Sequence, residues 1–219
     1  MEEGRASQAR LLESVERIPG ALSISYNAGE LLFQVGAFAA GVYVVERGVV
    51  MQGLYRQGKP VPTSLYAPGD AVGIESWLDE PAPRYRGFAR ALTAVRVQFV
   101  STQDWAQALA SPEFRGLLLD YLARAWLNRE VLHSLVSEPE RALAWLLWRW
   151  GEPVSGRLVL PANTSLIAHL IGCSRNAAGK ALEILVQEGA VEIANGSLVG
   201  FPQALRPYFE GALITSLQE

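Results

Sequence analysis

The chain of 219 residues has little of the chemistry that metal sites, disulfides and most catalytic centres require. Cys173 is its single cysteine, which excludes an internal disulfide, a four-cysteine iron–sulfur site and a structural zinc cluster. Its two histidines, His133 and His169, leave little for metal ligation or a catalytic triad. No phosphate-binding glycine loop occurs either. We therefore expect a protein that is not an enzyme and that holds no metal and no cofactor.

Long apolar runs are also missing. None approaches the roughly 18 residues that a membrane span needs, and the start of the chain, MEEG, lacks a basic-then-apolar signal pattern. Half of the residues are hydrophobic and about a fifth are charged. This composition predicts a cytoplasmic globular protein without membrane contact, built from one large or two small domains.

Acidic residues are absent from one part of the chain. They outnumber basic residues overall, 22 against 19, yet residues 153–182 contain none. The same segment carries Arg157, Arg175 and Lys180. Contact with phosphate depends on such local placement of positive charge and not on the charge of the whole chain.

The first hundred residues combine one helix with many short strands. Apolar residues recur at helical spacing from Ser7 to Ile18, and Pro19-Gly20 ends that helix. Short β-rich runs separated by Gly and Pro then predict an antiparallel sandwich, barrel or roll. The expected strands are Leu22–Tyr26, Glu30–Gln34, Val42–Glu46, Val49–Tyr55, Pro62–Tyr66, Ala71–Gly73, Arg86–Ala91 and Val95–Val100.

A long helix is expected over residues 112–136. Its apolar positions occupy more than one stripe, so one stripe can pack on the β domain while a second requires another partner. The alternative is a core helix within one monomer. We favour a homodimer, with interface candidates Leu118, Tyr121, Leu122, Ala125 and Leu132.

A new helix is predicted to begin after Ser137. Ser137 is the expected N-cap, Pro139 falls in the first turn, and Glu140 completes a capping box. We place a domain boundary here. The expected division is a sensor-like domain at 1–111, a dimerisation helix at 112–136 and a third domain at 137–219.

The segment LPANTSLIAHLIGCSRNAAGKALEILVQE, Leu160 to Glu188, contains a helix that is interrupted and restarted at once. Asn163 or Thr164 can cap a first short helix, Gly172 tolerates a positive φ, and Ser174 can cap the second helix. The second helix should bury its apolar positions and end at Gly189. Those positions are Ala178, Leu182, Leu185 and Val186.

A β-hairpin is predicted directly after these helices. Asn195-Gly196, a strong two-residue turn signal, lies between two short apolar runs. Helix, turn, helix and hairpin together predict a winged helix-turn-helix that binds double-stranded DNA. The alternative, a simple corner in a helical domain, explains neither the hairpin nor the acid-free segment.

Several motifs resemble those of the cyclic AMP receptor protein family of transcription regulators (the CRP/FNR family). IGCSRNAAGKALEIL resembles its recognition segment, GVYVVERGVV its roll hairpin, YAPGDAVGIESWL its Pro-Gly-Asp cassette, and EPERALAWLLW the helix that opens its DNA-binding domain. The resemblance implies an α+β fold with an antiparallel β-roll, a long dimerisation helix and a C-terminal winged helix-turn-helix. It also implies a homodimer on an inverted-repeat operator.

The resemblance further implies which residues contact DNA. Arg175 matches the arginine that reads guanine, Asn176 stands where glutamate is usual, and Lys180 stands where a second arginine is usual. Since asparagine can pair with adenine, the preferred half-site is expected to differ from the best-known one. Ser174, Thr164 and Ser165 are expected phosphate contacts. If the regulator activates transcription, RNA polymerase is a further partner.

The roll of this family can hold a cyclic nucleotide, and the candidate pocket residues here are Gly73, Glu75, Arg84, Tyr85 and Trp126. Tyr85 follows Arg84 where a small hydroxyl residue is expected, and the helix has no Thr-Ser pair near Trp126. We therefore expect a regulator that is active without cyclic nucleotide. The alternative is a ligand-gated regulator whose roll binds a cyclic nucleotide or another small effector.

Overall fold

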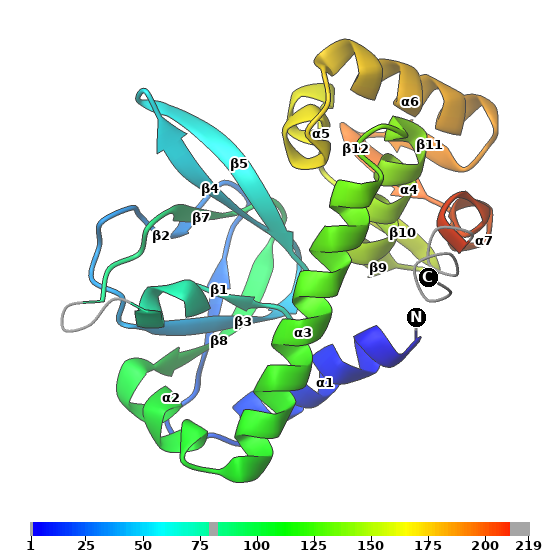
Figure 1. Cartoon of the computed structure of the whole chain (residues 1–219). Helices are drawn as coiled ribbons and strands as arrows, with labels where there is room; N and C mark the ends of the chain where they lie inside the picture. Colours follow the sequence, from blue (N-terminus) through cyan, green and yellow to red (C-terminus); the bar gives the residue numbers. More distant parts are fainter. Residues whose placement is uncertain (1, 79–82, 211–219) are drawn as a thin grey trace. The chain divides into compact units, whose positions relative to one another are not determined.

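The computed structural model describes residues 2–78 and 83–210, which fall into two compact units, Met1–Ala125 and Trp126–Glu219 (Figure 1). The division lies inside the long helix α3, Pro112–Ser134, and not at either of its ends. The three-part division expected from the sequence therefore stays a prediction.

The first unit is a β-roll of two four-stranded antiparallel sheets, with strand orders β1-β8-β3-β6 and β2-β7-β4-β5. All eight strands expected from the sequence are present, which confirms the predicted roll. Their bounds are β1 Leu22–Tyr26, β2 Leu31–Phe33, β3 Gly41–Arg47, β4 Val50–Arg56, β5 Lys59–Tyr66, β6 Ala71–Val72, β7 Phe88–Ala91 and β8 Val95–Ser101. A short 3-10 helix, η1 (Ile74–Leu78), follows β6.

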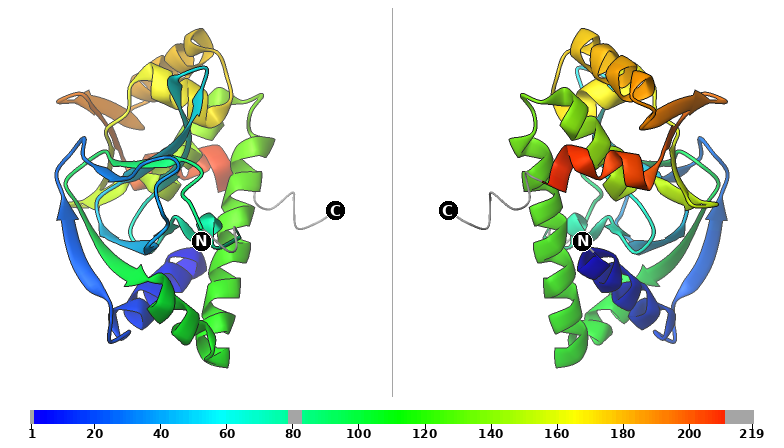
Figure 2. Two further views of the ribbon diagram at one scale, coloured as in Figure 1. Left: turned by 90° about the vertical axis from the view of Figure 1, so that its left-hand side faces the viewer. Right: turned by 90° about the vertical axis from the view of Figure 1, so that its right-hand side faces the viewer.

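Helices cover one sheet of the roll. Helix α1 (Glu2–Glu16) and helix α2 (Thr102–Leu109) lie beside the N-terminal part of α3 (Figures 1 and 2). Helix α2 was not predicted, although Ser101 caps it by accepting a hydrogen bond from the backbone N–H of Asp104. Trp105 of α2 is 1 % exposed and meets Phe114 of α3 edge to face, with ring centroids 5.3 Å apart. These contacts close an apolar layer between the helices and the sheet.

Asp70 and Ala71, where the chain enters β6, link helices α1 and α3 to the roll. Its carboxylate accepts hydrogen bonds from the Gln8 side chain of α1 and from the backbone N–H of Ala67, each at 2.8 Å. The neighbouring backbone N–H of Ala71 donates to the Tyr121 hydroxyl of α3 at 2.9 Å. Gly69 has φ +86°, and a Cβ there would lie 2.4 Å from the Cβ of Gln8, so only glycine allows this approach.

The second unit packs helices on a four-stranded antiparallel sheet of order β11-β12-β10-β9. The predicted hairpin is present as β11 (Val191–Ala194) and β12 (Ser197–Gly200). The hairpin β9–β10 (Glu152–Val154 and Arg157–Leu160) and helix α7 (Pro202–Leu205) were not predicted. The remaining helices are α4 (Pro139–Trp150), α5 (Thr164–Ile171) and α6 (Arg175–Gln187).

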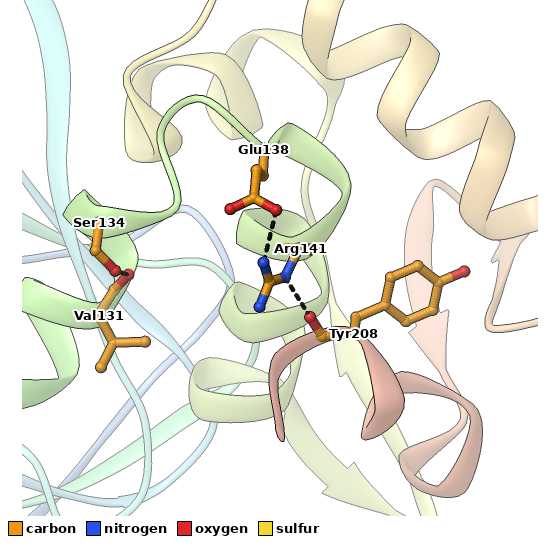
Figure 3. A network of polar contacts seen from close by, with 5 residues as sticks. All are labelled: Val131, Ser134, Glu138, Arg141 and Tyr208. Atoms are coloured by element: carbon orange, nitrogen blue, oxygen red, sulfur yellow. Dashed lines mark hydrogen bonds and ion pairs between the residues drawn. The ribbon is translucent and has the colours of Figure 1, made fainter. Parts of the chain in front are cut away.

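The capping box predicted at Ser137 is wrong. Glu138 is the N-cap of α4 and makes no side-chain cap bond, while Pro139 begins the helix. Figure 3 shows why the start of α4 is still fixed: Arg141 donates from Nη1 to the Glu138 carboxylate at 2.6 Å and from Nε to the Tyr208 carbonyl at 2.7 Å. This bridge holds the segment after α7 against α4, where Phe209 is fully buried beside Trp145.

The Tyr121 hydroxyl provides a test of the α3–roll junction. In Tyr121→Phe the buried N–H of Ala71 loses its acceptor, so we expect the free energy of unfolding to fall by about 1–3 kcal/mol. Calorimetric unfolding measures the change. The control is Tyr55→Phe, since Tyr55 is 48 % exposed. Equal effects of the two substitutions would contradict the role assigned to Tyr121.

Candidate functional site

The predicted helix break forms as expected and fixes the angle between α5 and α6. Asn163 caps α5 by accepting from the backbone N–H of Leu166 at 2.9 Å. Gly172 ends α5 in the left-handed conformation, with φ +83°. Ser174 then caps α6, accepting from the backbone N–H of Ala177 at 3.1 Å. Two helices joined by so short a turn have the geometry of a helix-turn-helix.

Helix α6 presents a polar face at its N-terminal end. Arg175, Asn176 and Lys180 are exposed, as the sequence suggested. The opposite side packs into the second unit through Ala178, Ala181, Leu182 and Leu185. Val186 was predicted to be buried, and this is wrong: it is 39 % exposed because the helix presents Ala181 inward instead.

The other proposed phosphate contacts lie beside this face. A Cβ placed on Gly179 of α6 would lie 3.8 Å from the Cγ2 of Thr164, so the first turn of α5 reaches the middle of α6. Ser165 follows Thr164 in that turn, and both are half-buried. The hydroxyl oxygen of Ser174 already accepts the cap bond. Its hydrogen can still be donated to a phosphate oxygen.

The hairpin β11–β12 follows α6 directly. Its turn is made by Asn195 and Gly196, both with positive φ (51° and 74°), as a two-residue primed turn requires. Glu192 of β11 pairs with Arg157 of β10 at 3.1 Å. Glu192 therefore offsets the charge of Arg157, and the positive surface of this segment depends on Arg175 and Lys180.

The exposed face of α3 differs from the expected one. Leu118 and Tyr121 are only 8 % and 3 % exposed, and Ala125 packs against the same core, so these side chains face the roll of their own chain. Leu132 is half-buried. Of the five interface candidates, Leu122 is exposed, and it belongs to an apolar stripe with Leu119, Trp126 and Leu127, which are 67 %, 68 % and 60 % exposed. Leu119, Trp126 and Leu127 widen the apolar surface of this helix in the sequence as well, but they were not among the expected interface residues.

An aromatic cluster lies in the interior of the roll. Tyr85 is 2 % exposed, and its ring stacks on Phe33 at a centroid distance of 3.8 Å and an interplanar angle of 12°. The Tyr85 hydroxyl donates to the Gly41 carbonyl at 2.7 Å. A Cβ placed on Gly73 would lie 2.9 Å from Cε1 of Tyr85, so the ring lies directly against the backbone of Gly73.

The other pocket candidates are arranged differently from the expectation. Arg84 does not enter the roll: it is exposed, and its Nη1 donates to the Gly36 carbonyl at 2.7 Å. Glu75 accepts a hydrogen bond from the Gln52 amide, whose oxygen accepts from the Tyr66 hydroxyl at 2.6 Å. Trp126 is exposed and donates to Glu130 on its own helix at 2.9 Å. Beside Gly73 there is thus an aromatic ring, and Arg84 is not positioned to bind a phosphate there.

Burial dominates the electrostatics of this cluster. It raises the pKa of Tyr85 and of Tyr43, and it raises the pKa of Tyr26 to about 12. Neutral phenols are therefore favoured. An anionic phosphate placed beside Gly73 would have to displace the stacked Tyr85 ring.

The chain thus combines a β-roll domain, a long helix and a helix-turn-helix that is followed by a hairpin. Residues 23–111 match the family model of the cyclic nucleotide-binding domain. No curated protein matches the chain.

Among the described residues, no helix is long and apolar enough to cross a membrane. In the same part of the chain, no group of His, Cys, Asp or Glu side chains is placed to hold a metal ion.

Solved structures similar to the chain include CRP/FNR transcription regulators, which confirms the inferred resemblance at the level of fold. FixK2 from Bradyrhizobium japonicum is 20 % identical with a TM-score of 0.65, covering 86 % of this chain and 96 % of that one. TTHA1359, a CRP/FNR regulator from Thermus thermophilus, is 23 % identical with a TM-score of 0.62, covering 86 % and 98 %. A putative cyclic nucleotide binding protein from Ruegeria pomeroyi is 19 % identical with a TM-score of 0.67, covering 94 % and 98 %.

The raised tyrosine pKa values predict a specific response to alkali. A phenol whose pKa is raised by folding stabilises the folded state fully below its unfolded value of about 10, and this contribution is lost as the pH rises through the folded value. Tyr26, for example, ionises near pH 12 in the folded protein. Ultraviolet titration should therefore show delayed tyrosinate formation that disappears in denaturant. Identical curves for folded and unfolded protein would contradict the burial of these phenols.

Proposed function

We propose that this protein is a sequence-specific DNA-binding transcription regulator of the CRP/FNR type. The observation that carries the proposal is the exposed N-terminal end of α6, with Arg175, Asn176 and Lys180 in a segment free of acidic residues. The hairpin β11–β12 directly after α6 supports a winged helix, in which the second helix of the pair enters the major groove.

The polar face of α6 suits base reading because its side chains differ in chemistry. The fork of Arg175 matches the O6 and N7 acceptors of guanine, and the amide of Asn176 matches N6 and N7 of adenine. Lys180 lies one turn further on and offers a rotatable donor to a guanine or a phosphate. Thr164, Ser165 and Ser174 would bind phosphates of the DNA backbone. These contacts set the register of the protein on the duplex but do not select its sequence.

The protein acts as a homodimer through α3. Four large apolar side chains, Leu119, Leu122, Trp126 and Leu127, form a stripe along this helix and are more than a third exposed. An exposed stripe of this size is typical of a helix that packs on a second copy. Two-fold symmetry then requires an inverted-repeat operator, with half-sites about 34 Å apart.

DNA binding does not require a cyclic nucleotide. The Tyr85 ring occupies the position beside Gly73, and Arg84 bonds outward to Gly36. A ligand acts by shifting a pre-existing equilibrium, and reversing a 1:99 population takes about 5.5 kcal/mol. Several buried aromatic side chains of the roll, among them Tyr85 stacked on Phe33, together supply stabilisation of this order without a ligand.

The proposal predicts the effect of removing the Arg175 side chain. Selection of bound duplexes from a random pool first gives the operator. On that operator, Arg175→Ala should lose about 1–3 kcal/mol of binding free energy and relax the preference at one guanine per half-site. Arg206→Ala is the matched control, because Arg206 is also exposed on the second unit but lies outside α6. If Arg175→Ala binds the operator as tightly as the unmutated protein, α6 does not read the bases.

The corrected α3 stripe predicts which substitution separates the two copies. Leu119→Glu would place a charge in the apolar seam, costing several kcal/mol of association, on the order expected for a buried unpaired charge. Light scattering at micromolar concentration should show a dimer for the unmutated protein and a monomer for this variant. Gln107→Glu adds the same charge at an exposed position of α2 and should stay dimeric. A monomeric unmutated protein would remove the basis for this interface.

Independence from cyclic nucleotide is testable with the selected operator. Affinity should change less than twofold when millimolar cyclic AMP or cyclic GMP is added, because neither displaces Tyr85. Calorimetry of the free protein should detect no binding of either nucleotide. An affinity that rises tenfold or more on addition would instead establish the ligand-gated alternative.

A further inference from the structure

A second recess lies on the rim of the roll, apart from the aromatic interior. It has a volume of about 330 Å³ and is formed where β1 ends, where β3 turns into β4, and where β8 begins. Its lining residues are Ser25, Tyr26, Asn27, Arg47, Ala94, Val95 and Arg96. This volume is near the lower limit of small-molecule sites, so the recess suits a small ligand.

Strand pairing brings the polar side chains of this recess together. Ser25 of β1 is paired with Arg96 of β8, and Arg96 is paired on its other side with Arg47 of β3. The neighbouring residues Val95 and Val97 are buried, so alternation along β8 turns Arg96 outward. A register shift between Val45 and Arg47 sets Arg47 opposite Arg96. Irregularities of this kind commonly re-aim side chains beside functional sites.

The pairing of two arginines is electrostatically unfavourable in isolation. Like charges directly opposite each other on neighbouring strands destabilise a sheet. One carboxylate offsets part of this repulsion: Glu46 lies 3.1 Å from Nε of Arg96 and also accepts a hydrogen bond from the Gln98 amide at 3.3 Å. Arg47 has interactions of its own within the protein. The lining of the recess itself includes two guanidinium groups and no acidic side chain.

We propose that this recess binds a small oxyanion, the phosphate or carboxylate group of a small molecule, between Arg47 and Arg96. The planar fork of each arginine matches the paired oxygens of either group, and the Ser25 hydroxyl can donate a further hydrogen bond. An anion shared by both guanidinium groups relieves the repulsion across β3 and β8. Because Tyr26 lines the recess and packs against the roll core, occupancy stabilises the roll. The inference is independent of the DNA-binding proposal.

The test uses the full chain with inorganic phosphate and, separately, acetate, each against chloride at constant ionic strength. Phosphate or acetate should raise the thermal midpoint in a saturable manner, and the tighter of the two identifies the preferred group. Arg47→Gln and Arg96→Gln should each weaken this binding at least tenfold. Arg56→Gln, an exposed arginine outside the recess, should leave it unchanged.

The arginine variants could lose the response because they fold poorly, so a variant that is expected to be more stable is also needed. Ser25→Asp places a carboxylate beside Arg96, so it should raise the midpoint without added anion and abolish the response to phosphate. Three outcomes would overturn the proposal. The first is that the thermal midpoint of the unmutated protein shows no saturable response. The second is an equal response in all arginine variants, which binding elsewhere or a general salt effect would give. The third is a Ser25→Asp protein that responds to phosphate like the unmutated one.

Discussion

The stacking of Tyr85 on Phe33, against the backbone of Gly73, is the contact on which the rest of this account depends. It places an uncharged ring, 2 % exposed, in the interior of the roll. The hydroxyl is satisfied by the Gly41 carbonyl, so the ring has no unpaired polar group that would favour its leaving. The position beside Gly73 is thus occupied by a side chain of the protein itself.

In the second unit, two local features determine the geometry of the helix-turn-helix. Gly172 in the left-handed conformation and Ser174 as N-cap fix the turn between α5 and α6 within three residues. The consequence is a helix end at which Arg175 and Asn176 are exposed. Arg141, in the first turn of α4, bonds the Tyr208 carbonyl far along the chain and so links α4 to the segment after α7 (Figure 3).

Local signals in the sequence predicted the elements that local chemistry determines. The eight strands, the Asn195-Gly196 hairpin and the interrupted helix follow from alternation, turn residues and caps. The face that α3 turns toward the roll did not follow, because Leu118 and Leu119 are equally apolar and differ by about 100° around the helix. Only packing against Trp105 and the sheet decides between them. Tyr85 and Arg84 pose the same problem, since their directions depend on which strand face meets the core.

The other failures have causes of their own. Ser137 has the sequence of a cap, but Glu138 takes the position while Arg141 binds its carboxylate. Helix α2 and the hairpin β9–β10 are too short for periodicity to reveal, and their neighbours stabilise them. The arginine pair at Arg47 and Arg96 could not be foreseen either, because it requires the register of β3 against β8.

A crystal structure of the protein on its selected operator, grown without nucleotide, tests the central claim most directly. The account predicts two copies joined along α3, each with α6 in the major groove and with Tyr85 still stacked on Phe33 and bonded to the Gly41 carbonyl. A roll in which Tyr85 has swung out and a copurified ligand lies beside Gly73 would contradict it.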